Sequence, residues 1–157
     1  MTEESSELHG YADEVGLFFE ATGLPRMPGR ILGWLLVCEP PHQSAEELAA
    51  ALQASRGSIS MAMQMLMGAG AVERYPVPGS RRTYYRMRPG FWLREAEDKA
   101  RLAGEWRKLA DRGLDLMRDR PEESRRRLQE ARDMYAFLEE EYARIKDLWL
   151  QRQERMT

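Results

Sequence analysis

Residues 44–87 read SAEELAAALQASRGSISMAMQMLMGAGAVERYPVPGSRRTYYRM, and this stretch decides the fold. Its beginning predicts a short helix over about residues 45–53. Ser44 and Glu47 have the spacing of a capping box, in which the serine oxygen accepts a backbone N–H and the glutamate returns a bond to the cap. The stretch therefore opens with a well-defined helix start.

A second helix is predicted after a tight turn at residues 53–54. Ser55 can cap this helix, and Gly68 and Gly70 end it. Its expected inward positions are apolar: Ile59, Met63 (or Ala62), Leu66 and Met67. Two short helices joined by a tight turn form a helix-turn-helix unit.

A β-hairpin is predicted next. Residues 72–75 and 83–87 are rich in β-branched and aromatic side chains, and they flank PVPGSRR at 76–82. The prolines and the glycine of that segment favour a turn and discourage interior strand pairing. A helix-turn-helix followed by a hairpin is typical of a winged helix.

Amphipathic or apolar helices are predicted on both sides of this stretch, at about 7–22, 28–37, 91–118 and 122 to the end. The predicted fold class is mainly α with a small β-hairpin: a winged helix-turn-helix plus long dimerisation helices at both termini. The expected domains are residues 1–22 as the N-terminal helix of the dimerisation region, 23–90 as the DNA-binding domain, and 91–157 as the C-terminal helical dimerisation region.

The second helix of a helix-turn-helix enters the major groove, so its outward residues should be small, polar or cationic. Arg56 can pair with guanine and Gln64 with adenine, while the serines suit phosphate or either base. The hairpin tip would add cationic contacts to the backbone or minor groove. The candidate DNA-binding residues are Ser55, Arg56, Gly57, Ser58, Ser60, Met61, Gln64, Gly79, Ser80, Arg81 and Arg82. Taken singly, each of these residues could instead be only a helix cap or a solvated surface charge.

Charge and composition agree with this prediction. The net charge is −2, yet residues 44–90 carry six arginines against three acids. Cys38 is the single cysteine, which excludes an internal disulfide and leaves too few thiols for a structural zinc site. The acidic start lacks the features of a signal peptide and no apolar run could span a membrane, so we expect a cytoplasmic protein without a membrane partner, metal or cofactor.

The last helix carries a heptad seam from Leu128 to Trp149. This seam can pack within one chain or on the same helix of a second copy, and we expect both. A dimer would double the DNA contact and set the spacing of two half-sites. The candidate dimerisation residues are Leu8, Tyr11, Val15, Phe18, Tyr135, Leu138, Tyr142, Ile145 and Trp149.

Four aromatic residues are candidates for a pocket that would hold a cationic small-molecule effector: Phe19, Trp34, Trp92 and Trp106. Core packing is the favoured alternative, because aromatic side chains at helical spacing usually lie in a core. Cys38 could sense oxidants, although burial in an apolar environment is the more common role of a free cysteine.

The segment ELAAALQASRGSISMAMQMLMGAGAVERYPVPGSRRTYYRM resembles the winged helix of the MarR superfamily, and SRGSISMAM and VPGSRRTYY look most like its GbsR-like branch. The earlier GLPRMPGRILGWLL is similar to the helix that precedes the DNA-reading unit there, and the resemblance covers about residues 8–95. It implies a homodimer with interlocked terminal helices on an inverted repeat. Some members of that branch respond to quaternary ammonium compounds. The matching residues are Ser55, Arg56, Gly57, Ser58 and Ser60 in the reading helix and Gly79, Arg81 and Arg82 in the wing.

The predicted function is therefore a sequence-specific DNA-binding transcriptional regulator, a repressor that binds an inverted-repeat operator as a homodimer and is released by a small-molecule effector. Its partners would be double-stranded DNA, a second copy and that effector. No set of residues suggests a catalytic site, so an enzyme is not expected. The alternative is a winged-helix protein–protein interaction module without specific DNA binding.

Overall fold

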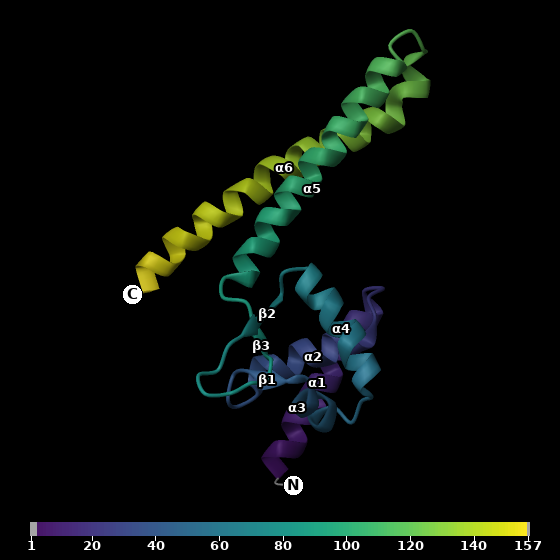
Figure 1. The fold of residues 1–157 in the computed structure, drawn as a ribbon. Helices are drawn as coiled ribbons and strands as arrows, with labels where there is room; N and C mark the ends of the chain where they lie inside the picture. The colour runs from purple at the N-terminus through teal and green to yellow at the C-terminus, as the bar shows by residue number, and fades with distance from the viewer. Residues whose placement is uncertain (1–2, 157) are drawn as a thin grey trace. The chain divides into compact units, whose positions relative to one another are not determined.

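The computed structural model describes residues 3–156, with side chains from residue 6 onward (Figure 1). The chain divides into unit 1, Met1–Phe91, and unit 2, Trp92–Thr157. Within residues 3–156, unit 1 contains four helices and three strands, and unit 2 consists of two long helices. In chain order the elements are α1 (Glu3–Ala21), α2 (Arg26–Val37), β1 (Gln43–Ser44), α3 (Ala45–Ala51), α4 (Arg56–Gly68), β2 (Val72–Tyr75), β3 (Tyr84–Met87), α5 (Phe91–Leu116) and α6 (Glu122–Met156).

Helices α1 and α2 pack with their backbones close together. A Cβ atom added at Gly33 would lie 3.0 Å from the Cα of Ala12, and one at Gly29 would lie 2.9 Å from the carbonyl oxygen of Val15. The glycines of α2 therefore leave no room for a side chain and allow the two backbones to approach closely. On α1, Ala12 is fully buried, whereas Tyr11 and Phe18 are 40% and 65% exposed.

The core of unit 1 joins α1 through α4 and reaches the start of the sheet. α2 contributes Ile31, Leu32 and Leu35, and most of the remaining buried apolar side chains come from α3 and α4 and the residues that follow them. Burial of this kind is the main stabilising term in a small domain. The cluster comprises Ala12, Ile31, Leu32, Leu35, Leu48, Leu52, Ile59, Ala62, Met63, Leu66, Ala71 and Val72.

The sheet has three antiparallel strands in the order β1-β3-β2. β2 pairs with β3 from Val72 opposite Met87 to Tyr75 opposite Tyr84, which confirms the predicted hairpin. The predicted pair of strands is incomplete, since β1 adds a third strand on the other side of β3. β1 is only two residues long, too short to give an alternating pattern in the sequence.

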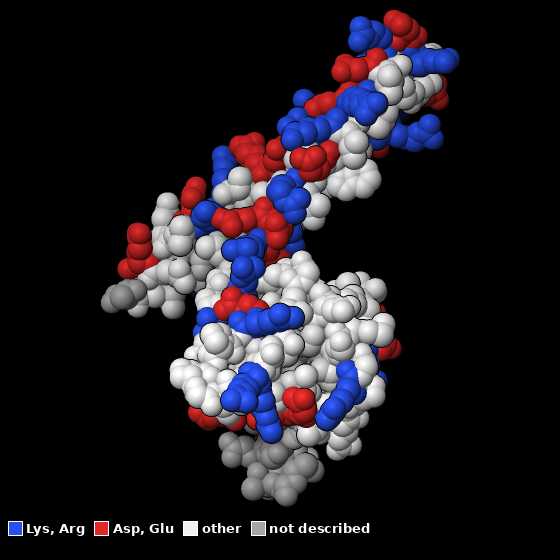
Figure 2. Space-filling view, viewed as in Figure 1, with Lys and Arg blue, Asp and Glu red and all other residues white. Residues whose placement is uncertain are grey.

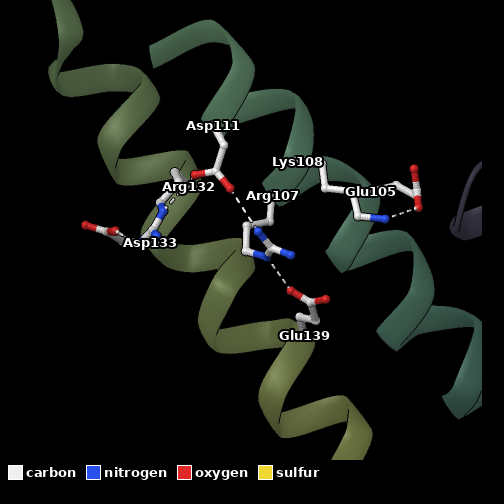
Figure 3. Close-up of polar contacts among 7 residues, drawn as sticks. All are labelled: Glu105, Arg107, Lys108, Asp111, Arg132, Asp133 and Glu139. Carbon is white, nitrogen blue, oxygen red and sulfur yellow. Dashed lines mark hydrogen bonds and ion pairs between the residues drawn. The ribbon is translucent and has the colours of Figure 1, made fainter. Parts of the chain in front are cut away.

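Unit 2 is an antiparallel pair of long helices whose charged side chains meet across the helix–helix contact (Figure 3). Arg107 on α5 donates to Glu139 on α6, and Asp111 accepts from both Arg107 and Arg132. The bond from Arg132 lowers the pKa of the Asp111 carboxyl. Farther along the pair, Lys146 Nζ lies 2.6 Å from Glu97 Oε1.

Small residues on α5 allow α6 to approach. Ala103, Gly104 and Ala110 are the buried residues of α5, and a Cβ added at Gly104 would lie 2.6 Å from Glu139 Oε1. Trp92 and Trp106 of α5 are more than half exposed. Within residues 3–156, no helix has the length and apolar character to cross a membrane.

Candidate nucleic-acid interface

The helix-turn-helix of unit 1 is defined by two caps. Ser44 Oγ accepts from the Glu47 N–H at 3.2 Å, and Glu47 Oε2 accepts from the Ser44 N–H at 2.7 Å, which confirms the predicted capping box. At the start of α4, Ser55 Oγ accepts from the Ser58 N–H at 3.1 Å. These local bonds determine where α3 begins and where α4 begins.

The turn between α3 and α4 is held from α2 by Arg30. Its Nη2 donates to the carbonyl oxygen of Leu52, the residue that ends α3, at 2.9 Å, and its Nε donates to Asp13 on α1. Leu52 is followed by Gln53, which has a φ of 49° in the left-handed region. Arg30 therefore connects α1 and α2 to the turn that orients α4, and sequence reasoning did not identify it.

α4 has one buried and one exposed side. Ile59, Ala62, Met63 and Leu66 are buried, in agreement with the predicted inward positions, and Met67 is half-buried. Most of the candidate reading residues are exposed: Ser58 is partly buried, and the exposed members are Ser55, Arg56, Gly57, Ser60, Met61 and Gln64. Gly57, Met61 and Gln64 lie opposite the buried side, and Arg56 is exposed in the first turn. The exposed surface of α4 presents an arginine, small hydroxyls, an amide and one methionine, which are side chains able to meet base edges and phosphates.

The hairpin loop is ordered by Ser80. The Ser80 N–H donates to the Val77 carbonyl at 3.1 Å, and its hydroxyl accepts from the Arg82 N–H at 3.2 Å. Gly79 has a φ of 81°, a conformation that favours glycine in this turn. Arg81 and Arg82 follow Gly79 and Ser80 and are exposed, so the predicted cationic tip lies in the loop that connects β2 to β3.

The six arginines of residues 44–90 fall into two groups. Glu73 binds Arg86, with Arg86 Nη2 2.8 Å from Glu73 Oε1, and lies 3.8 Å from Arg88. Arg86 also lies over the ring of Tyr75, 4.4 Å from its centroid. No ion pair among the described residues uses the other four, which are Arg56, Arg74, Arg81 and Arg82. Figure 2 shows the basic side chains of this face of unit 1 as separate patches on a largely uncharged surface.

Comparison with known proteins places the chain in a family. It is 46% identical over 129 residues to the HTH-type transcriptional regulator MmpR5 of Mycobacterium tuberculosis, an alignment that covers 82% of this chain and 78% of that protein. The chain belongs to the MarR family of transcriptional regulators. The profile of the MmpR5-like MarR family transcriptional regulators matches residues 90–154. The GbsR-like branch is not the group that this profile describes.

A solved structure matches the chain over most of its length. The crystal structure of a transcriptional regulator has a TM-score of 0.80 and 41% identity, and the alignment covers 92% of this chain and 99% of that one. A MepR mutant from S. aureus has 18% identity and a TM-score of 0.42, with 88% and 98% of the two chains covered. The relatives named here are regulators, not enzymes.

The residues predicted to form the dimer contact of this MarR regulator differ in exposure. Leu8 and Val15 are partly buried, whereas Tyr11 and Phe18 are exposed. On α6, Tyr135 stacks on Trp106 at 5.7 Å between ring centroids, and Leu138 and Tyr142 are partly buried. Ile145 and Trp149 are 41% and 45% exposed. The α6 seam therefore packs partly within the chain and leaves apolar surface outside.

The four aromatic residues of the predicted effector pocket are divided between the two units. In unit 1, Phe19 packs against the core and Trp34 contacts the His9 ring, with 4.6 Å between ring centroids. In unit 2, Trp92 lines a recess of about 220 Å³ with Leu93, Ala96, Ile145 and Trp149, while Trp106 stacks on Tyr135. The effector pocket stays a prediction.

Cys38 has the environment of an unreactive thiol. Burial, together with a smaller effect of the negative charge of Glu47, raises the pKa of this thiol to about 11. Its Sγ donates to the carbonyl of Pro40 at 3.3 Å. Because the thiolate is the reactive form, a protonated Cys38 is poorly suited to oxidant sensing at neutral pH. Among residues 3–156, no group of three His, Cys, Asp or Glu side chains could hold a metal ion.

Proposed function

We propose that the chain is a sequence-specific DNA-binding repressor in which α4 reads bases in the major groove and the wing contacts the DNA backbone or minor groove. The observation that supports this most strongly is the exposed surface of α4. The helix is capped by Ser55, exposes Arg56 in its first turn, and presents Gln64 opposite a fully apolar buried side. Such a surface matches the groove-reading helix of helix-turn-helix proteins. We also propose a cytoplasmic location for this regulator.

The proposal includes a homodimer on an inverted repeat. Tyr11 and Phe18 on α1, and Ile145 and Trp149 on α6, are large apolar side chains that one chain leaves exposed. A second copy would bury them and place two α4 helices on one duplex. A dimer that covers an operator would block transcription, and a small-molecule effector would release it. Placement of the chain in the GbsR-like branch of the family stays a prediction.

A protein–protein interaction module is the alternative, and salt dependence separates the two functions. Log affinity for DNA should fall linearly with log salt, with a slope of about −0.9 per phosphate contacted. Arg56→Ala should lower the preference for the best duplex by about 1–3 kcal/mol. Arg81→Ala should weaken binding to all duplexes and reduce the slope by about 1. Weak, salt-insensitive binding that neither substitution changes would favour the interaction module.

A further inference from the structure

A methionine lies at the centre of the exposed side of α4. The buried residues Ile59, Ala62, Met63 and Leu66 define the inward direction of this helix. At 100° per residue, the line directly opposite carries Gly57, Met61, Gln64 and Gly68. Met61 is 71% exposed, one of the most exposed large apolar side chains of the chain. An apolar side chain of this size at the centre of a proposed reading surface would be stabilised in the complex by contact with an apolar group of the DNA.

The turn of α4 that precedes Met61 is open. Long helical side chains lean toward the helix N-terminus, so Met61 covers the turn that contains Gly57, four residues earlier on the same line. A Cβ added at Gly57 would meet only Ser55 Oγ, 4.0 Å away, so packing within the chain does not require glycine there. The surface of α4 around Gly57 is therefore open at the end of the helix that is proposed to enter the groove.

The major groove offers one apolar group on the edges of its standard bases, the 5-methyl group of thymine. We propose that Met61, leaning over Gly57, packs against a thymine 5-methyl group and so determines specificity at that base pair. This inference rests on the proposed DNA-binding function. Gln64, three residues further along the same side, can bond the N6 and N7 atoms of an adenine, so the two side chains together favour a site with A·T pairs.

The test replaces thymine by uracil, which removes only the methyl group. A duplex recovered by selection from a random pool is remade with deoxyuridine at one thymine at a time, and affinities are measured by fluorescence anisotropy. For the wild-type protein, one thymine in each half-site should show about a fourfold loss of affinity, the equivalent of one buried methyl group.

Three variants complete the test, and melting temperatures check that each is folded. Met61→Ala should bind the thymine and uracil duplexes equally at that position. Met61→Leu, which keeps an apolar side chain of similar size, should retain the loss. Met65→Ala is the matched control, because Met65 is also exposed, at 47%, but lies off the central line of α4. It should retain the loss as well.

The results also separate this inference from the function on which it rests. If no thymine is sensitive in the wild-type protein, or if Met61→Ala keeps the sensitivity or Met65→Ala removes it, the role of Met61 is refuted while DNA binding stands. If no duplex is enriched and none binds, the DNA-binding function itself fails, and the role of Met61 fails with it.

Discussion

Gly57→Ala should make the protein more stable and a weaker DNA binder. Gly57 lies in the first turn of α4, has no positive φ, and leaves room for a Cβ. Replacing an exposed helical glycine by alanine raises the free energy of unfolding by about 0.5–1 kcal/mol, which corresponds to about 1–4 °C in melting temperature. In the complex, the added methyl group would stand where the helix meets the DNA. Overpacking of this kind costs about 1–3 kcal/mol, an affinity loss of about 5- to 150-fold.

Calorimetry measures the first effect and fluorescence anisotropy with the selected duplex measures the second. Gly10→Ala is the matched control, because Gly10 also lies within a helix, α1, with nothing within 4 Å of an added Cβ. It should raise the melting temperature by a similar amount and leave DNA affinity unchanged. The reasoning is refuted if Gly57→Ala is stabilising and binds DNA as tightly as the wild type, since the first turn of α4 would then not approach DNA closely.

Three further predictions concern other parts of the chain. Arg30→Met removes the bonds to Asp13 and to the Leu52 carbonyl, so it should lower the free energy of unfolding by about 1–2 kcal/mol and also lower DNA affinity. Arg30→Lys should recover only part of the stability and part of the affinity. Unchanged DNA affinity in Arg30→Met would rule out a role of Arg30 in orienting α4. The alkylation rate of Cys38 should keep rising with pH up to about 11, and a plateau near pH 9 would contradict its burial. The pKa of Asp111 is lowered in the folded chain, so the ionised carboxylate stabilises the fold above the unfolded pKa, and this contribution is lost as the pH falls through the folded pKa. Asp111→Asn should therefore be less stable than the wild type at pH 7. In thermal melts the difference in stability between the two proteins should narrow below about pH 4.

Local signals in the sequence were sufficient for the helix-turn-helix and the hairpin. The capping box of Ser44 and Glu47, the cap at Ser55 and the turn residues around Gly79 all act over a few residues, so their spacing alone predicts the structure they form. The inward side of α4 was also predictable, because a helix with one apolar side buries that side.

Features that depend on contacts between distant residues were not predictable in this way. The burial of Ala12 on α1 depends on the close approach of α2 through its glycines, and the spacing of apolar residues along α1 does not indicate it. The bonds of Arg30 span 17 and 22 residues, and nothing in the local sequence indicates them. Similarly, the pairing of Glu73 with Arg86 crosses the hairpin and removes a cation that the sequence alone counts as available for DNA.

Base reading by α4 is tested by selecting duplexes from a random pool with the wild-type protein and Arg56→Ala in parallel. The wild type should recover an inverted repeat whose half-site centres are about 34–36 Å apart, or a multiple of that distance. Arg56→Ala should recover sites in which the preference at one base pair of each half-site, expected to be a G·C pair, is lost. Recovery of no common sequence by the wild type, or of the same sequence by both proteins, would contradict base reading by α4.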